Sequence, residues 1–318
     1  MHSLLAFSFL WARVALGFYV AGLAAAVMAA LLKEPEQQNS VFGLARAAVA
    51  AGFLFQFVSL VETAAIFTAQ SADFYRIITG LLAFIIAAFF LAVYRAYSPR
   101  ALSLVVVPVI CLLAAAATVV PASVQSGPPA LERGLLFNGW IYLHIGLIFV
   151  GYAGLVVAMG SGVLYLVAER GLKAKGAAHV PKPDAAGLGL PGSPARPSGK
   201  RVAWRSHAGS RAHQSLPSLQ TLDLISYRSL LAGFPLLTAG LVIGVYWADA
   251  LLGGVALNDP TVVLALLAWV IYLVLLFARW SAGWRGRRSA YLTLACFGVA
   301  LAGWFANGLS QVHSLFLR

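Results

Sequence analysis

Eight long apolar runs dominate this chain of 318 residues and limit it to folds that use a lipid bilayer as solvent. A hydrocarbon core about 30 Å thick needs roughly 20 consecutive apolar residues in a helix. Such runs occupy residues 9–32, 42–67, 75–97, 101–121, 138–168, 226–252, 260–280 and 288–314. Only 10% of the residues are charged, whereas a soluble domain carries about 25%. We therefore predict an all-α fold, a polytopic membrane helix bundle with about eight transmembrane helices.

One long segment has a different composition. Residues 169–222 are basic, rich in Pro, Gly and Ser, and almost without apolar periodicity. A segment of that kind buries too little apolar surface to fold by itself. We therefore expect membrane helices one to five in 1–168, a disordered cytoplasmic linker in 169–222, and membrane helices six to eight in 223–318.

The position of the positive charge predicts the orientation. The net charge is +12, and the Lys and Arg residues gather in the 169–222 linker and in the connector from Arg279 to Arg288. The connectors 68–74, 122–137 and 253–259 carry one basic residue, Arg133. Basic connectors lie in the cytoplasm, so both termini should lie outside a bacterial cytoplasmic (inner) membrane. Charge confined to connectors favours lipid as a partner and gives no support to nucleic acid.

Two of the six histidines lie at the ends of apolar runs on the predicted outer side. His144 follows the start of the fifth run, and His313 lies near the end of the eighth. An ionisable side chain at membrane depth is a functional hypothesis by default, and imidazole is a common axial ligand of haem iron. Each histidine could instead bond a neighbouring helix or lie at the interface. We assign no role to the other four, which are His2, His179, His207 and His213.

Three further polar residues have two interpretations each. Gln56 and Glu62 in the second run could face a cavity or form interhelical hydrogen bonds. Asp259 precedes Pro260 at the start of the seventh run, where an acid caps a helix and proline fits the first turn. Capping is the interpretation that we favour for Asp259, with a ligand-binding role in the outer loop as the alternative.

Other local patterns indicate packing rather than chemistry. Gly240 and Gly244 form a Gly-x-x-x-Gly pair in the sixth run, which lets two helices approach closely. Cys111 and Cys296 both lie inside apolar runs, without a Cys-x-x-Cys motif. The chain has no Walker loop, dinucleotide fingerprint, Gly-x-Ser-x-Gly or zincin helix. We therefore expect a transport or assembly factor rather than an enzyme.

Several short motifs, in order along the chain, carry a family resemblance. They are Leu143-His144-Ile145, Gly151-Tyr152-Ala153, Tyr227-Arg228-Ser229, Gly233-Phe234-Pro235-Leu236-Leu237-Thr238, Tyr246-Trp247-Ala248, Asp259-Pro260, Trp269 with Tyr272, Gly283-Trp284-Arg285-Gly286-Arg287-Arg288, and Leu309 with His313-Ser314. Together they resemble the cytochrome c assembly family, the CcsA-, CcmC- and ResC-like haem-handling proteins and their HemX-like relatives. The resemblance covers roughly residues 138–168 and 222–318.

The resemblance implies haem transport or presentation at the outer membrane face. It implies haem b as the bound group, His144 and His313 as axial ligands of the haem iron, and other cytochrome c assembly proteins as partners. The chain departs from the family at several positions. Leu252, Ala256 and Asn258 stand where the family has tryptophans, Thr261-Val262 replaces a Lys-Glu pair, and Phe277 replaces an inner histidine. The chain therefore resembles a divergent member of the family, one that lacks the Trp-rich loop.

Three functions are consistent with these observations. The first is a haem-handling factor in cytochrome c biogenesis, with His144 and His313 as ligands. The second is a non-catalytic, HemX-like membrane scaffold or regulator of tetrapyrrole biosynthesis. A solute permease is less favoured, because the sequence shows neither a repeated half nor a pair of broken helices.

Overall fold

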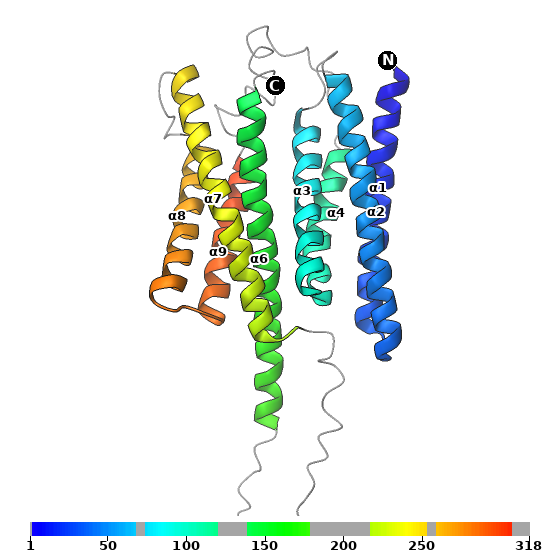
Figure 1. The fold of residues 1–318 in the computed structure, drawn as a ribbon, viewed down its shortest axis with the longest axis vertical. Helices are drawn as coiled ribbons and strands as arrows, with labels where there is room; N and C mark the ends of the chain where they lie inside the picture. The colour runs from blue at the N-terminus through cyan, green and yellow to red at the C-terminus, as the bar shows by residue number, and fades with distance from the viewer. Residues whose placement is uncertain (1, 68–73, 120–138, 179–216, 253–258, 307–318) are drawn as a thin grey trace, which may run out of the picture.

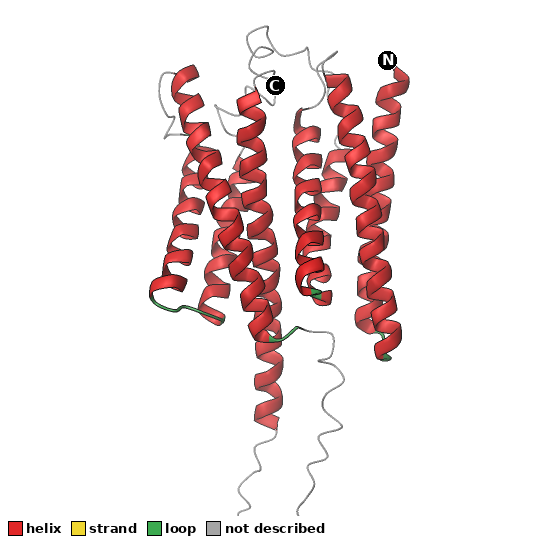
Figure 2. Ribbon diagram, in the orientation of Figure 1, coloured by secondary structure: helices red, strands yellow, loops and turns green. Residues whose placement is uncertain are grey.

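The protein is a bundle of long antiparallel helices in a computed structural model that describes residues 2–67, 74–119, 139–178, 217–252 and 259–306. Within these ranges there are helices and one short 3₁₀ turn but no strand (Figure 2). The elements are α1 (His2–Leu31), α2 (Pro35–Phe67), α3 (Phe74–Tyr97), η1 (Arg100–Leu102), α4 (Ser103–Val119), α6 (Gly139–Ala178), α7 (Leu219–Leu252), α8 (Pro260–Ser281) and α9 (Arg287–Ala306). The predicted all-α class is confirmed.

Eight helices in the described ranges are long and apolar enough to cross a membrane. Large apolar side chains cover their outer surfaces, such as Leu112, which is 71% exposed, and Val242, which is 64% exposed. Water would penalise that surface, whereas lipid does not. Together with the backbone bonds satisfied inside each helix, this confirms a multi-pass membrane protein.

The bundle has two ends (Figure 1). We call the end where α6 stops at Ala178 and α7 starts at Leu219 the linker end. The opposite end, where α6 starts at Gly139, is the histidine end. Helices α1–α4 form one group and α6–α9 the other, and α6 lies in the middle, packed against α3, α4, α7 and α9.

One apolar core joins the two groups of helices. Its buried members come from α1 to α4, from α6 and from the start of α7, and include Tyr19, Phe90, Ile110, Val157 and Ile225. A second core cluster lies among α6, α7, α8 and α9 around Tyr272. Since α6 contributes to both clusters, it holds the two groups together and fixes the position of its own polar side chains.

The helices next to the linker extend further than the sequence indicated. We expected the fifth helix to stop at residue 168, but α6 continues to Ala178, and α7 begins at Leu219 rather than at 223. Glu169 and Lys173 form an ion pair of 2.7 Å one turn apart, and such i, i+4 pairs stabilise an exposed helix. No proline occurs between Gly139 and Pro181, so the helix can leave the membrane intact. The rest of the predicted linker, 179–216, lies outside the described residues.

A buried ion pair closes the linker end of α6–α9. The Arg279 side chain is only 5% exposed, and its Nη2 donates to Asp223 Oδ2 over 2.8 Å. Arg279 also donates to Ser289 Oγ (2.6 Å), while the backbone N–H of Gly286 donates to Asp223 Oδ1 (3.1 Å). These bonds join α7, α8 and the turn before α9. Gly286 has φ +66 and an added Cβ would collide with Tyr165, which explains the need for glycine in that turn.

Candidate functional site

His144 lies near the start of α6, with its ring pressed against α7. Its Nδ1 is 2.7 Å from the carbonyl oxygen of Gly240. A carbonyl oxygen only accepts hydrogen bonds, so Nδ1 carries the proton of this bond. The predicted alternative of an interhelical hydrogen bond is thus confirmed for His144, but the bond occupies only one of its two ring nitrogens.

Glycines on α7 make room for the imidazole. A Cβ added to Gly244 would lie 2.5 Å from His144 Cε1, and one added to Gly240 would lie 2.9 Å from the side chain of Ile148. The Gly-x-x-x-Gly pair was predicted to allow close helix packing, and this is confirmed. It also has a more specific effect: Gly240 supplies the acceptor for the ring and Gly244 supplies the space.

The bond to Gly240 fixes which nitrogen of His144 is available. When Nδ1 donates to a carbonyl, the neutral ring has its lone pair on Nε2. Nε2 has no hydrogen-bond partner among the described residues. Histidines that bind metals usually have this arrangement, since the other ring N–H is donated to a carbonyl or carboxylate that orients the ring. His144 therefore has the chemical form of an axial ligand.

Aromatic side chains surround the same end of α6. Trp140 lies one turn before His144, on the same side of the helix, and is 58% exposed. On another face of α6, Phe149 packs against Trp304 of α9, with ring centroids 6.2 Å apart. The histidine therefore lies at a half-buried position between packed core and exposed aromatic surface, where a flat apolar ligand can contact aromatic rings.

The second proposed ligand cannot be placed relative to the first. His313 lies outside the described residues, as do Ala256 and Asn258, and α9 is described as far as Ala306. Within the described part of the chain, no group of three or more His, Cys, Asp or Glu side chains is arranged to hold a metal ion. Of the two predicted ligands, the described part of the chain therefore places His144 alone.

Asp259 caps α8. It is 4% exposed, and its Oδ1 accepts from the backbone N–H of Thr261 (2.9 Å) and of Val262 (3.4 Å). Pro260 follows in the first turn, where its missing N–H has no cost. The predicted cap is confirmed. Capping is sufficient to account for a buried carboxylate at this position.

The polar residues of α2 belong to the other group of helices. Gln56 is buried, and its Nε2 donates to the carbonyl oxygen of Gly80 on α3 over 3.5 Å, which confirms the interhelical alternative. Glu62 Oε2 is buried without a hydrogen-bond partner among the described residues. Since α2 packs on α1 and α3, neither residue belongs to the surroundings of His144.

Phe277 stands at the position where the family pattern has a histidine at the inner end of this helix. It lies near the linker end of α8 and is 61% exposed on the lipid-facing surface. An exposed phenyl ring has no lone pair for iron, so this position holds no ligand. The interior of the same helix end is occupied by Arg279 and its partner Asp223 instead.

Comparison with known proteins decides the family. The family model described as "Cytochrome C assembly protein" matches residues 49–313, which is most of the chain. The chain belongs to this family. The match extends the resemblance seen in the sequence to α2, α3 and α4, where the motifs alone gave little indication.

Individual cytochrome c assembly relatives agree with this assignment. The cytochrome c biogenesis protein CcsA of Synechococcus elongatus is 31% identical over 197 residues, which cover 59% of this chain and 60% of the relative. CcsA of Microcystis aeruginosa is 30% identical over 213 residues, covering 63% of this chain and 64% of the relative. The chain thus matches about three fifths of the length of these curated relatives. No solved structure matches it.

Proposed function

We propose that this protein handles haem during cytochrome c biogenesis and holds it at the histidine end of the bundle. His144 would supply one axial ligand through Nε2, and His313 would supply the other. Haem b would be the cargo rather than a resident catalyst. The observation that carries the proposal is the 2.7 Å bond from His144 Nδ1 to Gly240, since it orients the ring and leaves Nε2 for iron. Family membership supports the same conclusion.

The residues have distinct parts in such a site. Bound haem would supply the iron, and the chain would supply orientation and an apolar environment. Gly244 and Gly240 would fix the ring of His144, and Trp140 would contact the macrocycle. Two imidazoles on one iron need ring nitrogens about 4 Å apart, because each metal–nitrogen bond is about 2 Å. This geometry requires His313 to return over the end of α6.

We further propose that the histidine end faces the outside of a bacterial cytoplasmic (inner) membrane, with both termini outside. The distribution of Lys and Arg supports this orientation. Most basic residues with described side chains lie in the half of the bundle nearer the linker end, and connectors rich in Lys and Arg stay in the cytoplasm. Those in the linker half are Lys33, Arg46, Arg95, Arg100, Arg170, Lys173, Arg228, Arg279, Arg285, Arg287 and Arg288, whereas Arg13 and Arg76 lie in the histidine half. The segment 179–216 would then be a cytoplasmic linker.

The proposal is tested by the optical spectrum of the full chain purified from a haem-replete bacterium. We expect a bis-histidine Soret and α band in the unaltered protein and loss of both bands in His144→Ala and in His313→Ala. His213→Ala, in the predicted linker, serves as the matched control and should keep the spectrum. A colourless unaltered protein, or a spectrum that survives His144→Ala, would contradict the proposal.

One observation favours the HemX-like alternative. Helix α6 continues to Ala178, beyond the apolar part of the bundle, and so offers a rigid surface to a soluble partner. In that case the protein would act as a scaffold for an enzyme of tetrapyrrole biosynthesis. Cross-linking through 179–216 to such an enzyme, in a preparation that contains no haem, would favour the scaffold over haem handling.

A further inference from the structure

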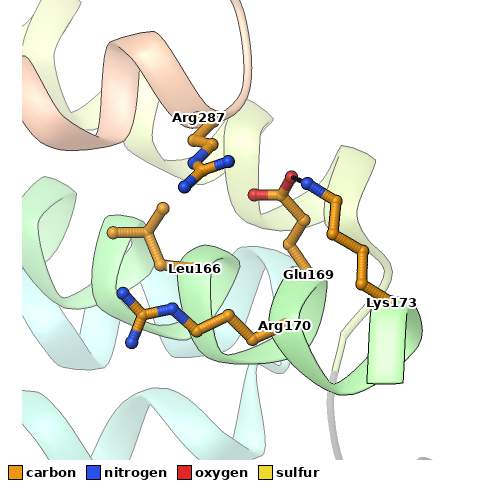
Figure 3. Close-up of a pocket in the computed structure, with 5 residues that line it drawn as sticks. All are labelled: Leu166, Glu169, Arg170, Lys173 and Arg287. Carbon is orange, nitrogen blue, oxygen red and sulfur yellow. Dashed lines mark ion pairs between the residues drawn. The ribbon is translucent and has the colours of Figure 1, made fainter. Parts of the chain in front are cut away.

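A small hollow lies between α6 and α9 at the linker end, far from His144. Its lining residues are Leu166, Glu169, Arg170 and Lys173 of α6 and Arg287, the first residue of α9 (Figure 3). The four residues of α6 are spaced i, i+3, i+4 and i+7, so they form one stripe on a single face of the helix. The hollow is small, with a cavity volume of about 60 Å³.

The hollow is positively charged. It contains three basic side chains and one carboxylate, and the Glu169 carboxylate is paired with Lys173 over 2.7 Å at one edge (Figure 3). Among the described residues, no carboxylate lies within ion-pair distance of Arg170 or Arg287. The Tyr291 ring lies beside Arg287, with the guanidinium carbon 5.7 Å from the ring centroid. The Tyr291 hydroxyl interacts with both Arg287 and Arg170. Each guanidinium has five N–H donors, so both keep donors for an anion after this contact.

The hollow lies at the level of the membrane where the hydrocarbon region meets the headgroups. Helix α8 has a described cap at each end, Asp259 and Ala282, and its 22 residues at about 1.5 Å each span about 33 Å. That length is close to the hydrocarbon thickness of a typical bilayer, so Arg287, which follows the short turn after α8, should lie where the headgroups begin. Leu166 is buried at the apolar side of the hollow, and Val167 beside it is 54% exposed to the lipid region. The hollow therefore has charge toward the headgroups and apolar side chains toward the acyl chains.

We propose that this hollow binds the phosphate of an anionic phospholipid from the leaflet at the linker end. Arg170 and Arg287 are the phosphate ligands, because a guanidinium donates two parallel hydrogen bonds to a phosphate. Leu166 contacts the glycerol region, and Glu169 limits the affinity by neutralising Lys173. The inference also explains why α6 extends past residue 168: without that extra turn neither Arg170 nor Lys173 would face α9. It is independent of haem binding.

Native mass spectrometry of the full chain in detergent tests the site. The probes are phosphatidylglycerol and phosphatidylcholine with the same acyl chains, each titrated alone, and phosphatidylglycerol again in the presence of millimolar inorganic phosphate. Arg170→Gln/Arg287→Gln removes the two proposed ligands. Arg285→Gln/Arg288→Gln removes the same charge from residues that flank Arg287 but do not line the hollow, and is the matched control. Glu169→Gln removes the carboxylate that competes for Lys173.

We expect one phosphatidylglycerol bound in preference to phosphatidylcholine. Its affinity should fall about thirty-fold in Arg170→Gln/Arg287→Gln, which corresponds to about 1 kcal/mol for each arginine, and should change little in the control pair. Glu169→Gln should tighten binding, an outcome that misfolding cannot produce. Equal loss in both arginine pairs, weaker binding in Glu169→Gln, or no preference for phosphatidylglycerol would overturn the proposal. Full displacement by phosphate would show a free-anion site and would overturn the assignment to lipid.

Discussion

Replacing Gly244 with alanine would place a methyl group in the space that the His144 ring occupies. The added Cβ would lie 2.5 Å from Cε1 and 2.9 Å from Nδ1. Carbon atoms in contact stay about 3.5–4.0 Å apart, so the ring would have to move by about 1 Å or more. A displacement of that size away from α7 would stretch the 2.7 Å bond to Gly240 beyond hydrogen-bond distance.

The expected loss follows from these distances. Overpacking a tight helix contact costs about 1–3 kcal/mol. Loss of a neutral hydrogen bond adds about 0.5–1.5 kcal/mol. For metal ligands, loss of the group that orients the ring lowers affinity about 10–100-fold. Gly244→Ala should therefore weaken haem binding by one to two orders of magnitude, measured by spectrophotometric titration of haem into the purified protein.

Two glycines of α6, the helix that packs on α7, provide controls of the same size. Gly146 has no atom within 4 Å of an added Cβ, so Gly146→Ala should bind haem as the unaltered protein does. A Cβ on Gly154 would lie 2.7 Å from the Ser229 carbonyl oxygen, so Gly154→Ala should lower the melting temperature without a specific loss of haem affinity. The reasoning is refuted if Gly244→Ala binds haem normally, or if all three variants lose affinity in proportion to their stability.

The other predictions concern stability in detergent. Asp259→Ala should lower the free energy of unfolding by about 1 kcal/mol, because it removes the α8 cap, and denaturant unfolding measures this. Asp259→Ser should restore most of the loss. An unchanged denaturant midpoint in Asp259→Ala would show that the cap contributes nothing. Asp223→Ala should lower the free energy of unfolding by about 3–5 kcal/mol, because it leaves Arg279 buried without its carboxylate partner. A loss of less than about 1 kcal/mol would contradict this. Trp269→Phe should cost about 1 kcal/mol by removing the 2.9 Å bond from Trp269 Nε1 to Thr238 Oγ1, and the same loss should not recur when Thr238 is already valine.

The bundle itself could be predicted because the bilayer imposes a simple length rule. Each apolar run found in the sequence corresponds to a helix of the structure, and the Asp259-Pro260 pair marks a helix start by local chemistry alone. Helix ends in water were predicted less well. Polar residues after 168 resemble a linker in composition, yet the Glu169–Lys173 pair and the helix already formed in the membrane extend α6 to Ala178.

The partners of the polar side chains could not be predicted, because they depend on which helices pack together. His144 and Gly240 are 96 residues apart, and Asp223 and Arg279 are 56 apart. A signal for the first pair was present: a Gly-x-x-x-Gly motif near the same end of the membrane as a histidine. Its interpretation required knowledge that α6 and α7 are neighbours. The same limitation made Arg279 look like one more basic residue of a cytoplasmic connector.

Chemical rescue tests most directly whether His144 binds haem iron. His144→Gly removes the imidazole and leaves a space beside Gly240 and Gly244 that free imidazole can enter. If His144 is an axial ligand, the bis-histidine spectrum should disappear in this variant and return on titration with imidazole. A spectrum that is unaffected by the substitution, or one that imidazole does not restore in a folded protein, would contradict the account.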